Sequence, residues 1–491
     1  MERRTKQLVA VVAIVVIATA SGVGIWLFLS LRGPTWLLPG APSGIPEDQW
    51  IKVGCLGDLN DIQGIGNYEG AHFAAYEINS NGGVEVNGTT YYVAVAKEDT
   101  AESRPVYDAT IGVAAAERML EVHGAEYIVG GFRTEVLEAY IETVMDAETL
   151  FFGTGAATDD FCENVADDYG RYKYFFRFMP INSTALGTQI ISFVLGLIMW
   201  LNSTHTEDLK NAVILREDLS WTAGMGPLIQ YALTHNTAYN FTNVQDKPYP
   251  ADSTADYFDQ LWQQIETYQT DGAHLVVPII SAGTGVFMMD KYHSRQPDCV
   301  IVGINVESQL DEYWTDTLGD ARYETMMQPL VRTNKTEKTI EYYDAYKNYT
   351  GHSPLYTASG AYDSVKMLVH AINETQGFNN TEIIEFLEDN TFENFSPFVR
   401  KLKWNQFHDL VAYMEFGDDF ELAQTLMAQW QEGGEKVAVD SWPDWFIEQV
   451  NFTAGGLLPS PINPFSFYPT DMETEPYSLP SWVNTSWGSL V

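Results

Sequence analysis

The stretch Tyr127–Ala139, "YIVGGFRTEVLEA", contains the pattern that decides the fold. Its first residues are apolar or glycine, which is typical of a short β-strand that is buried on both faces. The following "TEVLEA" has the composition of a helix start, and Arg133 and Thr134 lie at the turn between the two. A buried strand that runs directly into a helix predicts one unit of a parallel α/β sheet.

Seven more apolar runs of this kind alternate with helical patterns along the chain. They begin at Ile51, Tyr91, Leu150, Tyr174, Asn211, Ala273 and Cys299. Clear helical patterns cover 183–201 and 254–270, and 336–390 is predicted to be mostly helical, before a hairpin-like segment at 401–417. This number of strand-and-helix units is larger than one ordinary sheet contains. We therefore predict two lobes, each a doubly wound parallel sheet.

Charge and cysteine content limit the function classes. The chain has 66 acidic and 27 basic residues, a net charge of −39, which argues against binding nucleic acid or an anionic membrane surface. Cys55, Cys162 and Cys299 are too few and too scattered for a disulfide framework, and no spacing suggests a metal. We expect them to be buried free thiols.

The N-terminus predicts a membrane anchor. Residues 1–7 carry three basic residues, and 8–31 are 24 residues without a charge. A helix of that length would reach roughly 36 Å, enough to cross a bilayer core of about 30 Å. The basic flank predicts that residues 1–7 are cytoplasmic and that the bulk of the chain is extracellular. The alternative is a signal peptide cleaved at Ala18–Ala20, which would leave an apolar stretch on the mature chain.

Two further features fit an extracellular chain with a linker and a tail. Segment 32–50 has four prolines and three glycines and is predicted to be a linker. The tail 441–491 is rich in proline and aromatic residues, and we expect it to pack on its own domain rather than on a partner. Eleven N-x-S/T sequons predict a glycoprotein; they lie at Asn87, Asn182, Asn202, Asn240, Asn334, Asn348, Asn373, Asn379, Asn394, Asn451 and Asn484.

No catalytic or cofactor motif is present in the sequence. HExxH, GxSxG and GxxxxGK[ST] are absent. The stretch "GIGNYEG" at 64–70 has GxGxxxG spacing, which differs from a dinucleotide fingerprint, and is predicted to be a flexible loop of the first strand-and-helix unit. We therefore expect no enzyme activity, no cofactor and no metal.

Two neighbouring strand-to-helix junctions have matching chemistry. Residues 131–134 and 155–158 each end in a threonine where a helix N-cap belongs, and the first adds Arg133. Parallel strands open their pocket at the carboxyl ends, so a small anionic group could bind between the two junctions. The alternative is that both threonines only cap helices and that Arg133 pairs with Glu135 or Glu102.

A long ordered series of segments resembles a known family. "IKVGCLGDLNDIQGIGNYEGAHFAAYEINSNGGV" at 51–84 is followed by "YIVGGFRTE", "FFGTGAATDD", "AVILREDLSWTAGM", "CVIVGIN", "TASGAYDSVKMLVHAI" and "KLKWNQFHDL". The series resembles type I periplasmic solute-binding proteins of the leucine/isoleucine/valine-binding kind, which are associated with ABC transporters. The resemblance implies two lobes joined by three crossovers. Lobe 1 would comprise 51–178 and 330–396, and lobe 2 would comprise 179–329 and 397–440.

The resemblance also implies a set of ligand-binding residues. The ligand carboxylate would be held by Thr134, Ala156 and Thr158, and Trp221 would cover the ligand. Ser281 and Asn305 would line the lobe 2 side. This chain departs from the pattern at Arg133, where the family has a small or neutral residue, and at Asn305, where an acidic partner for the α-ammonium is common. Arg133 therefore favours a ligand with an extra anionic group, although Asp218 or Asp363 could replace the missing carboxylate.

The predicted function is capture of a small carboxylate-bearing solute, an amino acid or related compound, and its delivery to an ABC permease. The permease and its ATPase would be separate chains. The alternative is the ligand-binding ectodomain of a sensory or receptor complex, because the same fold serves both uses. An extracellular hydrolase would need a catalytic set that the sequence lacks.

Overall fold

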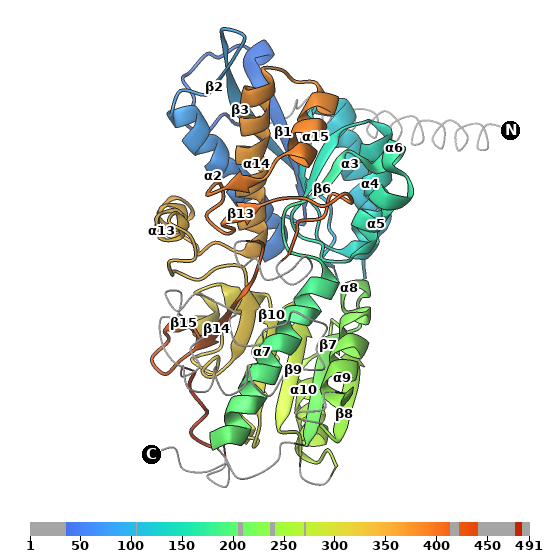
Figure 1. Cartoon of the computed structure of the whole chain (residues 1–491), viewed down its shortest axis with the longest axis vertical. Coiled ribbons are helices and arrows are strands. Elements are labelled where there is room, and N and C mark those ends of the chain that lie inside the picture. The colour runs from blue at the N-terminus through green and yellow to red at the C-terminus, as the bar shows by residue number, and fades with distance from the viewer. Residues whose placement is uncertain are drawn as a thin grey trace, which may run out of the picture.

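The protein consists of two α/β lobes stacked along its longest axis, as the computed structural model in Figure 1 shows. The structure describes residues 36–104, 106–204, 210–235, 241–269, 272–412, 422–439 and 477–483. The predicted cytoplasmic residues 1–7, the predicted membrane anchor 8–31 and most of the tail lie outside these ranges.

Lobe 1 is built on a six-stranded sheet with the order β2-β3-β1-β4-β5-β6. The strands are β1 (Trp50–Gly57), β2 (Val84–Val86), β3 (Thr89–Asp99), β4 (Tyr127–Gly130), β5 (Leu150–Gly153) and β6 (Phe175–Arg177). All neighbours are parallel except β2, which is antiparallel to β3. The helices are α2 (Ile62–Ser80), α3 (Ala109–Glu117), α4 (Thr134–Asp146), α5 (Asp160–Asp167), α6 (Tyr169–Tyr172), α13 (Thr339–Thr350), α14 (Tyr356–Thr375) and α15 (Asn380–Asp389).

Lobe 2 is built on a seven-stranded sheet with the order β15-β14-β11-β10-β9-β7-β8. The strands are β7 (Asn211–Glu217), β8 (Asn243–Tyr249), β9 (Leu275–Ile280), β10 (Val300–Asn305), β11 (Thr325–Gln328), β14 (Leu426–Trp430) and β15 (Lys436–Ala438). Only β14 and β15 run antiparallel to their neighbours. The helices are α7 (Ser183–Thr204), α8 (Ser220–Ala223), α9 (Met225–His235), α10 (Ala255–Glu266), α11 (Gly285–Arg295) and α12 (Tyr313–Asp316).

All eight predicted strands are present, as β1, β3 to β7, β9 and β10, and the two parallel-rich sheets confirm the predicted fold class. The predicted helices at 183–201 and 254–270 correspond to α7 and α10. Strand β8 was not predicted because it lies at a sheet edge, carries Pro248 and is mostly polar, so it lacks the apolar run of a central strand.

The stretch 64–70 forms part of α2 and not the flexible loop predicted from its glycines. The glycines are required by packing, because α14 lies directly against this face of α2. A Cβ on Gly70 would come within 2.0 Å of the carbonyl oxygen of Ala358, and one on Gly66 within 2.5 Å of Thr357 Oγ1. Two helices can approach this closely only where a side chain is missing.

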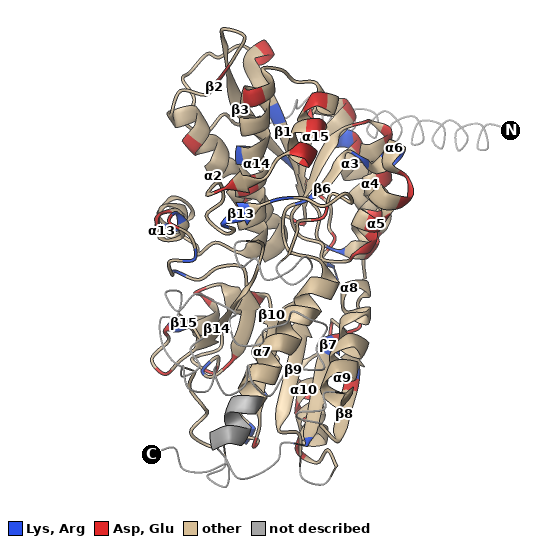
Figure 2. Ribbon diagram, in the orientation of Figure 1, with Lys and Arg blue, Asp and Glu red and all other residues tan. Residues whose placement is uncertain are grey.

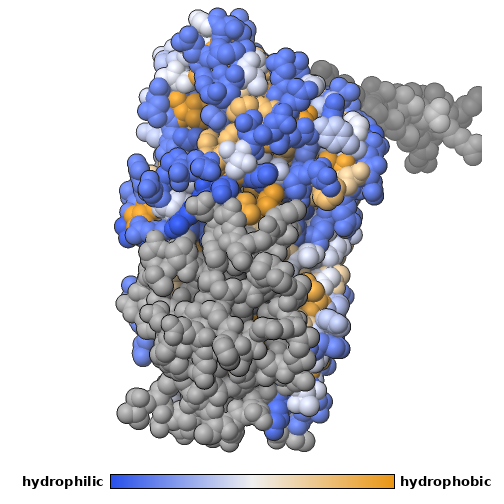
Figure 3. Space-filling view, viewed as in Figure 1, coloured by the Kyte–Doolittle hydropathy of each residue, from blue (hydrophilic) through white to orange (hydrophobic). Residues whose placement is uncertain are grey.

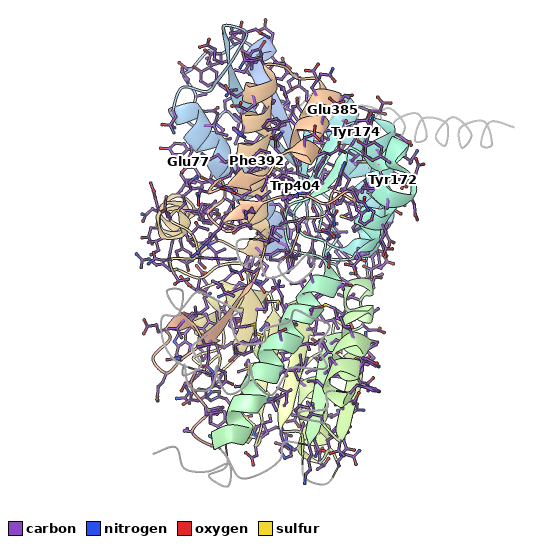
Figure 4. The ribbon with its side chains drawn as sticks, viewed as in Figure 1. Glu77, Tyr172, Tyr174, Glu385, Phe392 and Trp404 are labelled. Atoms are coloured by element: carbon purple, nitrogen blue, oxygen red, sulfur yellow. The ribbon has the colours of Figure 1, made fainter. Side chains whose placement is uncertain are left out.

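Residues 401–412 lie against lobe 1. Figure 4 shows Trp404 and Phe392 in this lobe, and their ring centroids are 6.1 Å apart. The indole Nε1 of Trp404 donates to the carbonyl of Arg177 at 2.7 Å. The described part of the predicted hairpin-like segment folds back on itself, because Trp404 and Leu410 form an antiparallel bridge and the N–H of Val411 donates to the carbonyl of Lys403 at 2.9 Å. Before it, β13 (Lys401–Leu402) pairs with β12 (Phe392–Glu393), and residues 413–421 lie outside the described residues. The resemblance groups 397–440 with lobe 2, but in the structure only β14 and β15 join its sheet.

The described part of the C-terminal tail packs on lobe 2. Ser478 and Gln429 exchange two hydrogen bonds of 2.8 Å, one in each direction. The ring of Trp482 lies 5.3 Å from that of Tyr292 and 4.8 Å from that of His293. The prediction that the tail packs on its own domain is confirmed for residues 477–483.

The surface of lobe 1 is polar and acidic. Figure 2 shows acidic residues gathered on α4, α5 and α15, and Figure 3 shows a mostly hydrophilic face with small, separate hydrophobic areas. Within the described ranges, no helix is both long and apolar enough to cross a membrane. The three cysteines are buried and free, as predicted.

The predicted glycosylation sites differ in accessibility. Six described sequon asparagines are exposed: Asn87, Asn334, Asn348, Asn373, Asn379 and Asn394. Asn182 is buried, and its Nδ2 donates to Asp409 Oδ2 at 2.9 Å. Asn182 therefore cannot carry a glycan in the folded chain, and its sequon was a misleading signal.

Candidate ligand-binding site

A cavity lies between the lobes at the carboxyl ends of the central strands. It has an empty volume of about 570 Å³ including its open mouth. Lobe 1 and lobe 2 both contribute to the wall, which is formed by Phe132, Gly155, Ala157, Met179, Pro180, Leu186, Trp221, Ser281, Ile304, Val306, Gln309, Met327, Gln328, Pro329, Tyr356 and Thr425. This is where an open α/β sheet binds a ligand.

A buried arginine holds the lobe 1 loop of the cavity. Arg177 ends β6, is 0% exposed, and pairs with Asp409 at 2.7 Å. Its two terminal nitrogens donate to the carbonyls of Ala156 and Thr158. Because these carbonyls are bound by the guanidinium, the backbone of the loop after β5 is fixed beside the cavity.

A buried carboxylate holds the corresponding loop of lobe 2. Glu217 ends β7 and is 0% exposed. It accepts hydrogen bonds from the N–H and Oγ of Ser281 at 2.8 and 2.7 Å, and from the N–H of Ala282 at 2.9 Å. Burial raises its pKa, while these hydrogen bonds act in the opposite direction. Each lobe therefore positions its cavity loop with one charged residue from a strand end.

Two of the predicted binding residues, Trp221 and Ser281, line the cavity. Ala156 lies between the lining residues Gly155 and Ala157 without lining the cavity itself. The helix-capping role predicted for Thr134 and Thr158 is wrong. The N-cap of α4 is Arg133 and that of α5 is Asp159, and neither helix has a side-chain cap.

Arg133 is not among the residues that line the cavity, whereas Phe132 beside it is. The guanidinium pairs with Glu135 at 3.2 Å, donates to the carbonyl of Arg104 at 3.0 Å, and lies 4.3 Å from the ring centre of Tyr107. Of the two roles considered for Arg133, the structure shows the ion pair with Glu135.

The residues considered as partners for a ligand ammonium group do not line the cavity either. Asn305 Nδ2 donates to Tyr313 at 2.9 Å and to Glu324 at 2.8 Å within lobe 2. Asp218 is exposed, and Asp363 is buried in lobe 1, where it accepts a hydrogen bond from Ser396. None of these residues lines the cavity.

Direct hydrogen bonds join the two lobes beside the cavity. Glu135 of lobe 1 accepts from the N–H and Oγ of Ser220 of lobe 2 at 3.1 and 2.7 Å. Gln63 Nε2 of lobe 1 donates to the carbonyl of Ser281 at 2.8 Å. The lobes are thus in contact across the cleft.

Several acidic residues near this contact have raised pKa values. Burial raises the pKa of Glu102 to about 7 and that of Asp61 to about 6 in lobe 1. In lobe 2, burial and then repulsion from Asp61 raise the pKa of Glu307 to about 7. Within the described residues no cluster of His, Cys, Asp or Glu could hold a metal ion.

Sequence reasoning missed Arg177 and Glu217, and it named Glu102 only as a possible ion-pair partner of Arg133. The signal was present for the first two, because each is a charged residue inside an otherwise apolar strand, in "YFFRFM" and "NAVILRED". A charge in such a strand is buried and must be paired or hydrogen-bonded. Glu102 lies in an irregular loop after β3 and has no comparable signal.

The fold and the cavity agree with the comparisons. A family profile described as periplasmic binding protein matches residues 51–418, so this chain belongs to that family. It is a family of solute-binding proteins, not of enzymes. Among curated protein sequences, none matches this chain.

Solved structures with the same fold include three ABC transporter proteins. A branched-chain amino acid ABC transporter protein from Silicibacter pomeroyi has 15% identity and a TM-score of 0.65, covering 88% of this chain and 99% of that one. LivJ from Streptococcus pneumoniae, in complex with isoleucine, has 16% identity and a TM-score of 0.60 over 79% and 97%. A solute-binding protein from R. palustris, in complex with benzoate, has 14% identity and a TM-score of 0.60 over 79% and 95%.

Proposed function

We propose that this chain is an extracellular, membrane-anchored solute-binding protein that captures a small carboxylate-bearing compound and delivers it to an ABC permease. The observation that carries the proposal is one cavity whose wall comes from strand ends of both lobes. A ligand in that position contacts both lobes at once, so its binding free energy favours the closed form that a permease would recognise. The apolar segment 8–31 supports the anchor.

A thermal-shift screen of the full chain tests this proposal. The panel contains amino acids, aromatic and aliphatic carboxylates, dicarboxylates, amides and short peptides. A ligand at 100 times its dissociation constant adds about 2.7 kcal/mol to the free energy of unfolding. If no carboxylate-bearing compound raises the melting temperature, the proposed function is wrong.

Trp221→Ala is expected to weaken the affinity for the tightest compound of that screen about tenfold or more. The indole lines the cavity, and truncating a large aromatic side chain at a ligand contact costs on the order of 2 kcal/mol. Isothermal titration calorimetry measures the change. Tyr231→Ala removes an exposed aromatic ring from α9 and is the control, with unchanged affinity expected. Equal affinities for the Trp221→Ala variant and the parent chain would place the ligand elsewhere.

Arg133→Ala is expected to leave the affinity for the same compound within about twofold of the parent value. The guanidinium is engaged by Glu135 and Tyr107, outside the cavity wall. A loss of tenfold or more at unchanged thermal stability would show instead that Arg133 binds the ligand directly.

A further inference from the structure

No charged side chain is present among the described residues that line the cavity. An ammonium group that leaves water for such surroundings loses hydration worth several kcal/mol unless a carboxylate or several acceptors replace it. Glu217 is the buried carboxylate that contacts the lining residue Ser281, and it already accepts three hydrogen bonds from Ser281 and Ala282. The Glu217 carboxylate is therefore engaged by hydrogen bonds within the protein and does not pair with a ligand ammonium group.

Among the side chains that line the cavity, the buried polar atoms without a hydrogen-bond partner are donors. Trp221 Nε1 and Gln328 Nε2 are buried and have no acceptor. The main-chain N–H groups of Ala156–Ala157 also donate to no group in the described part of the chain. A buried donor without an acceptor is costly, so a ligand that supplies acceptors gains at this site.

Two acceptors on the cavity wall, by contrast, already have a donor. Gln309 Oε1 accepts from the N–H of Tyr356 at 3.3 Å, and the carbonyl of Ser281 accepts from Gln63 at 2.8 Å. An ammonium group would have to share these acceptors with the protein's own donors, whereas a carboxylate would meet donors that have no partner. The imbalance favours a ligand that accepts hydrogen bonds.

Apolar and aromatic side chains form the remaining wall. Phe132 follows β4, Trp221 lies in α8 and Tyr356 begins α14, and Met179 and Met327 also line the wall. Aromatic rings and methionines provide flat and adaptable surfaces that suit a ring or a branched chain.

We infer that the ligand is an apolar carboxylic acid without an ammonium group, with an aromatic ring or a branched chain. This inference rests on the proposed function and names its ligand class. The carboxylate would accept hydrogen bonds from the donors around the cavity, and the apolar part would lie against the aromatic wall.

Matched ligand pairs test the inference on the full chain by isothermal titration calorimetry. The pairs are 3-phenylpropanoate with phenylalanine, and 4-methylpentanoate with leucine, which differ only by the amino group. The acid without the amino group is expected to bind at least tenfold more tightly in each pair.

Equal or tighter binding of the amino acids would overturn the inference and leave the proposed function in place. The same holds if only dicarboxylic or strongly polar compounds of the screen bind. If no carboxylate of any kind binds, the inference and the proposed function are both wrong.

Gln328→Glu provides a second test, because it places a carboxylate where an unpaired donor now lies. It is expected to weaken 3-phenylpropanoate binding at least tenfold and to reduce or reverse the preference over phenylalanine. Gln263→Glu adds the same charge on the exposed face of α10 and is expected to leave both affinities unchanged. An unchanged preference in a Gln328→Glu variant of normal melting temperature would contradict the inference, and the wild-type comparison stands without this variant.

Discussion

Arg177→Met is expected to lower the free energy of unfolding by about 3–5 kcal/mol, the usual cost of removing one partner of a buried ion pair. Methionine occupies a similar volume but cannot donate. The substitution leaves the Asp409 carboxylate without its 2.7 Å partner and the carbonyls of Ala156 and Thr158 without donors. Urea unfolding followed by fluorescence and circular dichroism measures the change.

Arg332→Met is the matched control for this substitution. Arg332 pairs with Asp344 at 2.7 Å, but the two side chains are 55% and 45% exposed, so a loss below about 1 kcal/mol is expected. Adding Asp409→Asn to Arg177→Met removes the unpaired buried charge and should restore part of the lost free energy of unfolding. If Arg177→Met costs no more than Arg332→Met, the guanidinium does not hold the loop after β5.

Glu102→Gln is expected to stabilise the protein by about 3 kcal/mol at pH 8 and to have little effect near pH 4. Burial raises the pKa of Glu102 to about 7, from about 4.3 in an unfolded chain. The folded state therefore binds the proton more tightly, and the stability from this group is lost as the pH rises from about 4 to about 7. Glutamine stays neutral, and its amide oxygen can accept the N–H groups of Phe132 and Arg133 that Glu102 accepts at 3.2 Å.

The measurement for Glu102→Gln is a series of unfolding curves between pH 4 and pH 8.5. The difference between variant and parent should grow with pH and level off above pH 7.5. Glu121→Gln changes an exposed glutamate and should track the parent at every pH. A constant difference between Glu102→Gln and the parent across this range would mean that Glu102 keeps its charge in the folded protein.

The sequence predicts the sheets well because central parallel strands are buried on both faces and appear as continuous apolar runs. The strands it missed include the edge strands β2, β8 and β15, of which β8 is mostly polar. Glycine spacing was misleading at 64–70, because a glycine that opens a turn and one that admits a neighbouring helix look alike in sequence. Only the position of α14 separates the two.

For the site, the sequence identified two junctions that contribute to the cavity wall, but it could not determine which residue of each junction faces the cavity. Phe132 lines the wall and Arg133 does not, and Ile304 and Val306 line it on either side of Asn305. Successive side chains of an extended chain point in opposite directions, so an offset of one residue reverses the assignment. Asp218 was considered as a replacement for the missing carboxylate, whereas the buried carboxylate beside the cavity is its neighbour Glu217.

The buried thiols make lobe closure directly measurable. Cys55, Cys162 and Cys299 are the only cysteines of the chain, and all three are buried with raised pKa values because of that burial. Thiolate is the form that reacts with maleimide dyes, so the native residues should remain unlabelled in the folded protein. A pair of cysteines introduced on exposed positions, one on each lobe, would take up a donor and an acceptor dye without removal of any native cysteine. Single-molecule energy transfer between the dyes would then follow opening and closing in the native chain.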